Sequence, residues 1–155
     1  MLIRKAETND IPAILDLLSP VLEVHAVIRP DLFVSGTRKY TGEELQEILK
    51  DENRPVFVAE ENGKVLGYCF CVLQQVEHSN NLRDSVSMYI DDLCVDEHCR
   101  GKKIGKALND FVTEYARERG CYDITLNVWE GNDPAIAFYR KLGYAPRKTV
   151  MEKIL

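Results

Sequence analysis

The sequence predicts a single α/β domain over residues 1–155, and three observations support this prediction. Strand-like apolar runs alternate with amphipathic helical segments, and no linker, internal repeat or low-complexity tract separates them. The chain is 45% hydrophobic and 29% charged, which is the composition of an ordinary globular protein rather than a disordered one. A chain of this length can bury roughly two-thirds of its unfolded surface in one core.

The first third of the chain predicts a short strand and two helices. Residues 2–5 are the strand candidate, and the helix that follows repeats apolar residues at helical spacing. Pro20 should kink or end that helix, because proline lacks the backbone donor. Residues 25–33 have no clear period and are predicted to be a loop or a broken helix. The sequence Thr41-Gly-Glu-Glu44 matches a capping box, which predicts a short helix that ends near residue 50.

The middle of the chain predicts a β-hairpin and a third strand. Two β-rich runs, residues 54–60 and 65–74, flank the dipeptide Asn62-Gly63. Asn-Gly is a strong hairpin signal because both residues accept the positive φ angles of a tight turn. After a polar loop, residues 86–95 are predicted to form the next strand.

The last third predicts two more helices and two more strands. Apolar residues at helical spacing run from Ile104 until Gly120 ends the helix, and residues 123–128 read as a strand. Asn132 or Asp133 can cap a short helix that begins at Pro134 and stops at Gly143. Residues 148–155 are predicted to be a closing strand.

Residues 90–108 combine a strand, a polar turn, a basic glycine-containing loop and a helix. The first backbone N–H groups of a helix are unpaired, and together with the positive end of the helix dipole they attract anions. Four cations lie within this loop and the first helical turn: Arg100, Lys102, Lys103 and Lys106. Gly101 and Gly105 would let the backbone approach a ligand closely. The stretch therefore predicts a phosphate-binding site, and the alternative is a solvated charge run before an ordinary helix.

Net charge, cysteine content and hydropathy limit which partners and which cell compartment the sequence predicts. The net charge of −5 argues against a nucleic-acid partner, and it fits either a cationic substrate or a role in solubility alone. No long apolar run occurs, so we expect neither a signal peptide nor a membrane span. Five cysteines without CxxC spacing predict reduced thiols in a cytoplasmic protein. Cys94, His98 and Cys99 match no common structural zinc pattern, so we expect no metal.

Two passages resemble the GCN5-related N-acetyltransferase (GNAT) superfamily. The stretch from Leu93 to Leu108, LCVDEHCRGKKIGKAL, is similar to the family's acetyl-CoA pyrophosphate loop. The stretch from Asn127 to Tyr144 is similar to the family's Asn…Ala…Phe-Tyr…Leu-Gly-Phe/Tyr segment. The order of the two passages and the opening strand–helix–helix–strand–strand also match. The resemblance implies a mixed, mostly antiparallel sheet of six to seven strands with helices on both faces.

The resemblance also implies acetyl-CoA as co-substrate. Main-chain groups of Leu93 and Val95 would pair with its pantetheine arm, amides of residues 100–106 would hold its pyrophosphate, and Asn132 would bind the coenzyme or cap the helix. The residues implied to bind the cofactor are Leu93, Cys94, Val95, Arg100, Gly101, Lys102, Lys103, Ile104, Gly105, Lys106, Asn132, Ala135 and Phe138.

One position departs from the family pattern. Lys103 stands where the loop usually has its first glycine. If φ must be positive there, a side chain costs about 1–2 kcal/mol, which an ion pair between Lys103 and phosphate could offset. Otherwise the backbone is right-handed helical or extended at that point. We expect the phosphate cradle to survive in either case.

The resemblance implies Tyr139 as the general acid near the coenzyme sulfur, and the alternative is a tyrosine that only packs the core. Asp91 and Asp92 are candidates for the base or for an anchor of a cationic substrate. Because successive strand residues face opposite sides, only one of the two should face the cleft. Likeness to polyamine-acetylating members favours Asp91. Both could instead bind only backbone or arginine groups, and solvent could serve as the base.

His25, Arg29, Asp31 and Phe33 lie in the segment that borders the acceptor pocket in this family, and we expect them to help select the amine. A lone histidine can equally be structural. Members that act on ribosomal protein N-termini tend to have Glu where Asn127 stands, so that substrate class loses support.

The sequence thus predicts an acetyl-CoA-dependent N-acetyltransferase that acts on a small-molecule amine, a polyamine or an exposed lysine. The alternative is a non-catalytic acyl-CoA sensor or regulatory module. A nucleotide kinase is disfavoured because the Gly-x-x-x-x-Gly-Lys-Ser/Thr loop is absent. The resemblance also implies a homodimer through residues 148–155, because many members of the family dimerise through C-terminal strands.

Overall fold

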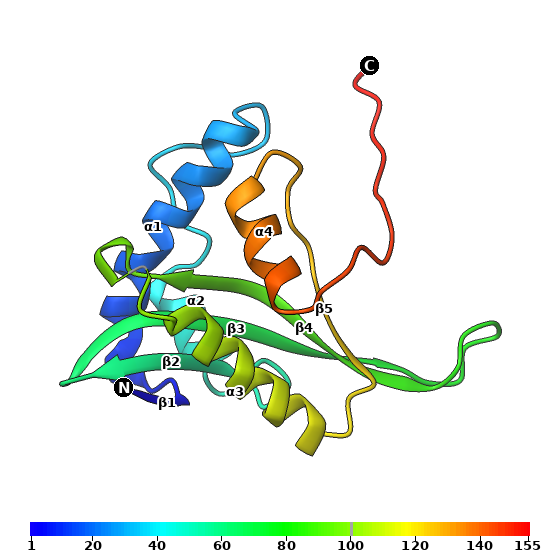
Figure 1. The fold of residues 1–155 in the computed structure, drawn as a ribbon, viewed down its shortest axis with the longest axis horizontal. Coiled ribbons are helices and arrows are strands. Elements are labelled where there is room, and N and C mark those ends of the chain that lie inside the picture. The colour runs from blue at the N-terminus through cyan, green and yellow to red at the C-terminus, as the bar shows by residue number, and fades with distance from the viewer. Residues whose placement is uncertain (100) are drawn as a thin grey trace.

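In the computed structural model, which describes residues 1–99 and 101–155, a five-stranded sheet has helices on both faces (Figure 1). The strands follow one another across the sheet in chain order. Their bounds are β1 (Leu2–Lys5), β2 (Val56–Glu61), β3 (Lys64–Val76), β4 (Ser85–Val95) and β5 (Asp123–Leu126). Neighbouring strands are antiparallel except β4 and β5, which are parallel. The mixed, mostly antiparallel architecture is confirmed, but the described residues form five strands rather than six or seven.

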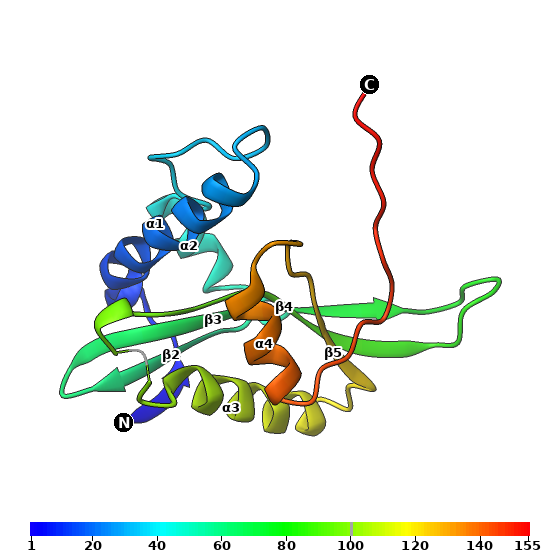
Figure 2. The same ribbon diagram turned by 45° about the horizontal axis from the view of Figure 1, so that its top comes forward.

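The helices form two layers with separate cores. Their bounds are α1 (Ile11–Ile28), α2 (Gly42–Ile48), α3 (Ile104–Glu118) and α4 (Asp133–Lys141), with 3-10 turns at Thr8–Asp10 and Glu97–Cys99. One core lies between α3 and the sheet and includes Leu108 and Phe57, and the other lies between α1, α2 and the sheet and includes Ile14 and Val58. Figure 2 shows α3 below the sheet and α1 with α2 above it. Successive side chains of a strand point to opposite faces of the sheet, so they contribute in turn to the two cores.

The predicted turns and caps are confirmed where the local sequence specifies them. Asn62 and Gly63 adopt φ angles of 54° and 76° between β2 and β3. The hydroxyl of Thr41 accepts from the N–H of Glu44, whose carboxylate accepts from the N–H of Thr41. Asn132 caps α4 by accepting from the N–H of Ala135. Each of these signals is satisfied by atoms only a few residues apart.

The prediction that Pro20 kinks or ends the first helix is wrong, because α1 continues through Pro20 to Ile28. Pro20 and Asp16 both lie on the exposed side of α1, where water can satisfy the carbonyl that loses its partner. The segment Thr8–Ile28 is long and apolar enough to cross a membrane by length and composition. Ile14 and Leu18 on it are fully buried against the sheet, whereas Val24 and Val27 near its end are exposed.

The predicted closing strand over residues 148–155 is also wrong. These residues form neither helix nor strand, and the segment after α4 extends away from the sheet (Figures 1 and 2). Val150, Met151, Ile154 and Leu155 are exposed. A strand needs a neighbour, and within the described part of this chain the segment pairs with none.

Candidate active site

A β-bulge in β4 determines where the two candidate carboxylates lie. Opposite β3, Phe70 pairs with Asp92 while Cys71 pairs with Ile90, so Asp91 is the extra residue. Ile90 and Leu93 both belong to the core under α3. The two aspartates between them therefore share the opposite face, the one covered by α1 and α2. The prediction that they face opposite sides is wrong, because the bulge interrupts the alternation on which it depended.

The bulge also marks the point where β5 leaves β4. The two strands pair from Ser87–Asp123 to Ile90–Leu126 and no further. Beyond that point, in the part of the chain that the structure describes, Leu93–Val95 pair with β3 on one side and have no strand on the other. An extended ligand can pair with a strand edge of this kind. Figures 1 and 2 show α4 next to the place where β4 and β5 diverge.

The turn between β4 and α3 has the backbone of an anion cradle. Gly101 and Lys103 adopt positive φ angles of 82° and 62°, so Lys103 has the left-handed conformation and is neither right-handed helical nor extended. No side-chain cap bonds the N-terminus of α3 within the described residues. Its first N–H groups are therefore left for a ligand or for solvent. Arg100, one of the predicted phosphate contacts, lies outside the described residues.

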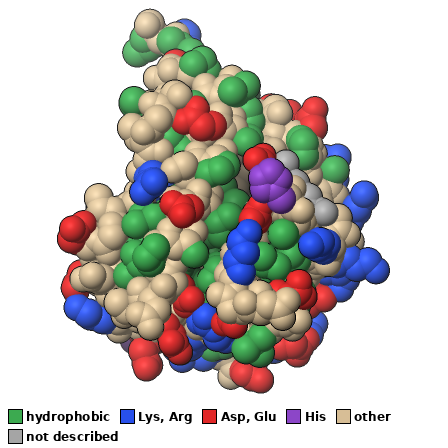
Figure 3. All heavy atoms as spheres, turned by 90° about the vertical axis from the view of Figure 1, so that its left-hand side faces the viewer, with side chains coloured by type: hydrophobic (Ala, Val, Ile, Leu, Met, Phe, Trp, Pro, Cys, Tyr) green, Lys and Arg blue, Asp and Glu red, His purple; other side chains and the backbone are tan. Residues whose placement is uncertain are grey.

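The basic side chains around this turn differ in their partners. Lys102 and Lys103 are exposed, whereas Lys106 pairs with Asp110 one turn further along α3. Figure 3 shows several basic side chains along one edge of this face, and further basic and acidic side chains scattered over the rest. A positive edge beside an uncapped helix N-terminus favours an anionic ligand.

Gly105 has a packing role that the sequence did not predict. A Cβ at this position would lie 3.1 Å from Cζ and 3.3 Å from Cε2 of Phe138. It would also lie 3.6 Å from Cγ2 of Val95. Gly105 thus lets α4 pack against the start of α3, and through Phe138 it sets the position of the helix that carries Tyr139.

Asp91 is held by two consecutive residues of the segment before α2. Its Oδ2 accepts a 2.7 Å hydrogen bond from the Tyr40 hydroxyl and lies 2.9 Å from Nζ of Lys39. Lys39 also donates to the Asp91 carbonyl at 3.2 Å. Asp91 therefore fixes the segment that covers it.

Asp92 has a different environment. Its Oδ2 accepts a 3.1 Å hydrogen bond from the Tyr68 hydroxyl. Burial raises the pKa of Asp92 to about 6, against the opposing effect of the positive charge of Lys39. A carboxylate with this pKa is ionised at neutral pH and is still basic enough to accept a proton.

Tyr139 lies on α4, half-buried, with its ring in edge contact with Phe138 and Tyr144. Burial raises its pKa well above the ordinary value, and the nearby Cys69 and Asp92 raise it further. The phenol is therefore protonated at neutral pH and can act as a donor. The Tyr144 hydroxyl donates to the buried Asn109, whereas the Tyr139 hydroxyl has no hydrogen-bond partner among the described residues.

The predicted acceptor residues come together with one residue that was not predicted. The ring of His25 contacts that of Phe33 at 5.2 Å, and Phe33 contacts Trp129 edge-on at 5.5 Å. The guanidinium of Arg29 lies 5.7 Å from the Trp129 ring and is paired with Asp31 and Glu152. Burial lowers the pKa of His25, and the charge of Lys39 lowers it further, which keeps the imidazole neutral.

Sequence reasoning missed Trp129 and the tyrosine and lysine partners of the two aspartates. Trp129 is the only tryptophan of the chain, a signal that could have drawn attention to it. Lys39, Tyr40 and Tyr68 gave no signal, because they reach the aspartates from distant segments of the sequence.

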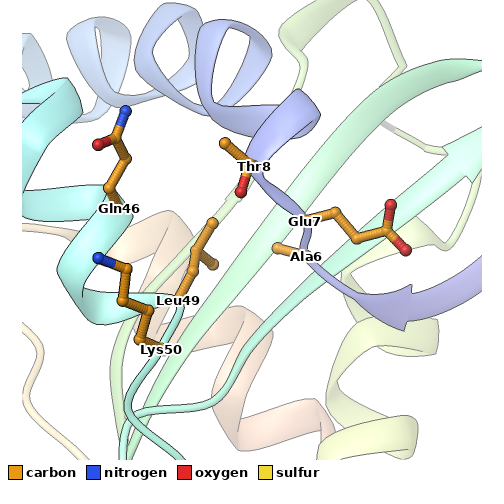
Figure 4. A pocket seen from close by; sticks show the side chains of 6 residues that line it. All are labelled: Ala6, Glu7, Thr8, Gln46, Leu49 and Lys50. Atoms are coloured by element: carbon orange, nitrogen blue, oxygen red, sulfur yellow. The ribbon is translucent and has the colours of Figure 1, made fainter.

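Metal ligands, cysteines and cavities bear on what the site can bind. The described residues contain no group of three or more histidine, cysteine or acidic side chains that could hold a metal ion. All five cysteines are described, and none forms a disulfide. One cavity lies between the turn before α1 and α2, lined by residues that include Glu7 and Lys50 (Figure 4). A second cavity lies between α1 and residues 36–42. Neither lies at the open edge of β4.

Known proteins resemble this chain in sequence and in fold. Residues 21–144 match the model of the Acetyltransferase (GNAT) family. MJ1207 of Methanocaldococcus jannaschii, an uncharacterized N-acetyltransferase, is 33% identical over 103 residues, which are 66% of this chain and only 44% of that protein. The putative phosphinothricin acetyltransferase YwnH of Bacillus subtilis is 28% identical over 94% of this chain and 84% of its own length. The crystal structure of a BH1408 tetramutant from Bacillus halodurans superposes with a TM-score of 0.95 at 31% identity, covering 100% of both chains.

Proposed function

Because the chain belongs to the Acetyltransferase (GNAT) family, we propose that it transfers the acetyl group of acetyl-CoA to a primary amine by direct attack. One observation carries the proposal: the open edge of β4 at Leu93–Val95 leads, through a left-handed turn, to the uncapped N-terminus of α3. An extended arm can pair with such an edge, and a pyrophosphate can accept hydrogen bonds from the first N–H groups of a helix.

The residues proposed to hold acetyl-CoA fit this geometry. Main-chain groups of Leu93 and Val95, on either side of Cys94, would pair with the pantetheine arm. Amides from Gly101 to Lys106, with the cations of Lys102 and Lys103, would bind the pyrophosphate. The N-terminal side of α4 would border the arm through Asn132, Ala135 and Phe138. Acetyl-CoA supplies an activated thioester that an amine nitrogen can attack.

We assign the proton transfers to Asp92 and Tyr139. Asp92 would take the proton from the acceptor ammonium, because its pKa of about 6 leaves it ionised at neutral pH. After attack the nitrogen would release its second proton to solvent. As the C–S bond breaks, Tyr139 would donate its phenolic proton to the departing sulfur and then recover a proton from solvent. Asp91 is less suited to act as the base, because Lys39 and Tyr40 already bind its carboxylate.

The acceptor side would be formed by the aromatic cluster of His25, Phe33 and Trp129. A small amine, a polyamine or an exposed lysine is compatible with this cluster. Arg29 would position Trp129 rather than bind substrate, because two carboxylates already hold its guanidinium.

Thermal-shift titration followed by a thiol-release assay tests the proposal. At about 100 times its Kd, acetyl-CoA should stabilise the protein by about 2.7 kcal/mol. With amines present, Tyr139→Phe should lower kcat by about a hundredfold or more and leave coenzyme binding intact. Tyr144→Phe is the matched control, which should lower stability by about 1 kcal/mol and leave kcat within a few-fold.

A non-catalytic acyl-CoA sensor is the alternative, and the same assay separates the two functions. A sensor would give the thermal shift but no amine-stimulated thiol release. No shift with acetyl-CoA, alongside a shift with another nucleotide, would contradict both functions.

Two further properties belong to this proposal. We expect a homodimer, because the extended segment at residues 148–155 exposes four large apolar side chains that a second copy could cover. Light scattering of the full chain and of a chain ending at Arg147 tests this expectation.

A cytoplasmic location is supported by five cysteines that form no disulfide.

A further inference from the structure

The segment between α1 and α2, residues 29–41, neutralises the outer of the two carboxylates. Lys39 and Tyr40 both bind Oδ2 of Asp91, at 2.9 Å and 2.7 Å. A cationic acceptor would have to displace Lys39 to use Asp91 as an anchor. Only Asp92 of the pair then remains for the reacting amine, and no second carboxylate is left for a second ammonium.

A cavity lies directly behind Tyr40. Its volume is about 540 Å³, and it is open to solvent rather than enclosed. Its lining is mixed: the hydroxyls of Ser19, Thr37 and Thr41 and the side chain of Arg38 lie beside Leu15, Tyr40 and two glycines. The ring of Tyr40 forms part of the wall, and its hydroxyl reaches Asp91. The cavity is therefore one tyrosine side chain away from the proposed catalytic carboxylates.

The arginines next to Tyr40 have no acidic partner. Arg38 donates from Nε to the neutral hydroxyl of Ser19 at 2.9 Å, and it forms no ion pair with any described residue. Arg54 lies near enough to Tyr40 to oppose the rise in the pKa of that phenol, and it too forms no ion pair with a described residue. By contrast, Arg4 and Arg29 each pair with two carboxylates.

One carboxylate does contact this segment from α1. Glu23 accepts hydrogen bonds from the Ser35 hydroxyl at 2.7 Å and from the Gly36 N–H at 2.6 Å. These bonds keep the pKa of Glu23 below its usual value. Glu23 therefore holds the segment in place and leaves the guanidinium of Arg38 without a counter-charge.

We propose that the acceptor is a primary amine that also carries an anionic group, and that the cavity lined by Arg38 takes this anion while the amine lies at Asp92. This inference rests on the proposed acetyl transfer and narrows its substrate class. An amino acid with a terminal amine or a phosphorylated amino sugar has the required chemistry. A polyamine does not, because its second ammonium would face Arg38 and Lys39.

Matched acceptors test the inference at low ionic strength, where exposed charges are least screened. The pairs are γ-aminobutyrate against putrescine, which replaces the anion with a second cation, and phosphorylated glucosamine against glucosamine. We expect kcat/KM to be at least tenfold higher for the anionic member of each pair, with the difference mainly in KM. A preference for putrescine and for unphosphorylated glucosamine would overturn the inference.

Arg38→Gln is the diagnostic variant, because Arg38 is exposed and its loss should not affect folding. It should lower the ratio of kcat/KM between the anionic and uncharged amino sugars by about tenfold, the usual size of one charge-assisted hydrogen bond. Arg83→Gln is the matched control, an exposed arginine in the loop between β3 and β4. The ratio should be unchanged in this control.

A binding measurement separates failure of the inference from failure of the proposed function. Calorimetry with the phosphorylated amino sugar, in the presence of CoA, should give a Kd that Arg38→Gln weakens about tenfold. If acetyl-CoA binds and amines are acetylated but Arg38→Gln changes neither this Kd nor the ratio, the inference is wrong and the acetyltransferase stands. If acetyl-CoA neither binds nor reacts, the proposed function and the inference fall together.

Discussion

The proposed coenzyme side and the proposed acceptor side of this protein are built from different parts of the chain. Most of the proposed coenzyme side comes from residues 93–99 and 101–106, with the α4 region beside it, and it offers mainly backbone groups along an open strand edge and an uncapped helix N-terminus. The acceptor side is assembled from side chains of α1, residues 29–41, β3, β4 and the loop before α4. Each of those segments contributes only one or a few groups.

This difference determines where substitutions should affect activity or stability. A backbone site tolerates most side-chain changes and responds only where a side chain alters the backbone itself, as at Lys103, or its packing, as at Gly105. A side-chain site responds to single substitutions at Asp92, Tyr40 or Arg38. Relatives can therefore share the first side and differ in the second.

Asp92→Asn should give the largest effect and should affect the acceptor side alone. Loss of the proposed base should lower kcat by about a hundredfold to ten-thousandfold, while the thermal shift with acetyl-CoA is retained. Asp91→Asn is the matched control: it should loosen the contacts of Lys39 and Tyr40 and act mainly on KM. If Asp91→Asn reduces kcat more than Asp92→Asn does, the assignment of the base is reversed. Loss of acetyl-CoA binding in Asp92→Asn would contradict the division into two sides.

The pH dependence of Asp92 provides a second, smaller test. Its deprotonated form is the active one, so kcat/KM should rise as the pH rises through about 6 and then level off. Stability should change in the opposite direction, because the folded state binds the proton more tightly than the unfolded state and stability falls between about pH 4 and pH 6. Asp92→Asn should therefore stabilise the protein at neutral pH by on the order of 1–3 kcal/mol. Chemical denaturation at pH 4 and pH 7 measures this gain, which should vanish at the lower pH.

The sequence predicted local turns and caps better than it predicted contacts between distant segments, for a physical reason. The Asn62-Gly63 turn, the Thr41 capping box and the strand–turn–helix around Lys103 each depend on neighbouring residues, so their patterns are visible in one window of sequence. The contacts of Asp91 with Tyr40 and of Asp92 with Tyr68 join residues far apart in the chain. No local pattern encodes such contacts.

The wrong predictions have the same origin. Whether Pro20 ends a helix depends on which side of α1 faces water, and whether residues 148–155 form a strand depends on a neighbour. The bulge at Asp91 is a property of two strands in register and not of β4 alone. Periodicity alone could not have predicted that both aspartates share one face.

Gly105→Ala tests the packing of the coenzyme side. The new methyl group would lie 3.1 Å from the Phe138 ring, so either α4 or the ring must move. Overpacking of this kind should cost about 1–3 kcal/mol in the free energy of unfolding. Phe138→Leu in the same chain should recover part of the loss, which a double-mutant cycle measures. If Gly105→Ala leaves stability unchanged and weakens only acetyl-CoA binding, Gly105 serves the ligand and not the packing of α4.

Lys103→Gly should give the smallest effect, and it separates backbone strain from charge on the coenzyme side. At a φ of 62°, a side chain lowers the stability of the folded state by about 1–2 kcal/mol. Glycine would remove this cost, but its greater conformational entropy in the unfolded state would offset part of the gain. The net gain in stability should be about 0.5–1 kcal/mol by denaturant unfolding. If Lys103 also pairs with phosphate, the affinity for acetyl-CoA should fall a few-fold and depend less on salt. Lys102→Gly is the control, because it removes a neighbouring charge without relieving strain, and it should lower stability slightly. If Lys102→Gly stabilises the protein as much as Lys103→Gly does, relief of backbone strain at Lys103 does not explain the gain in stability.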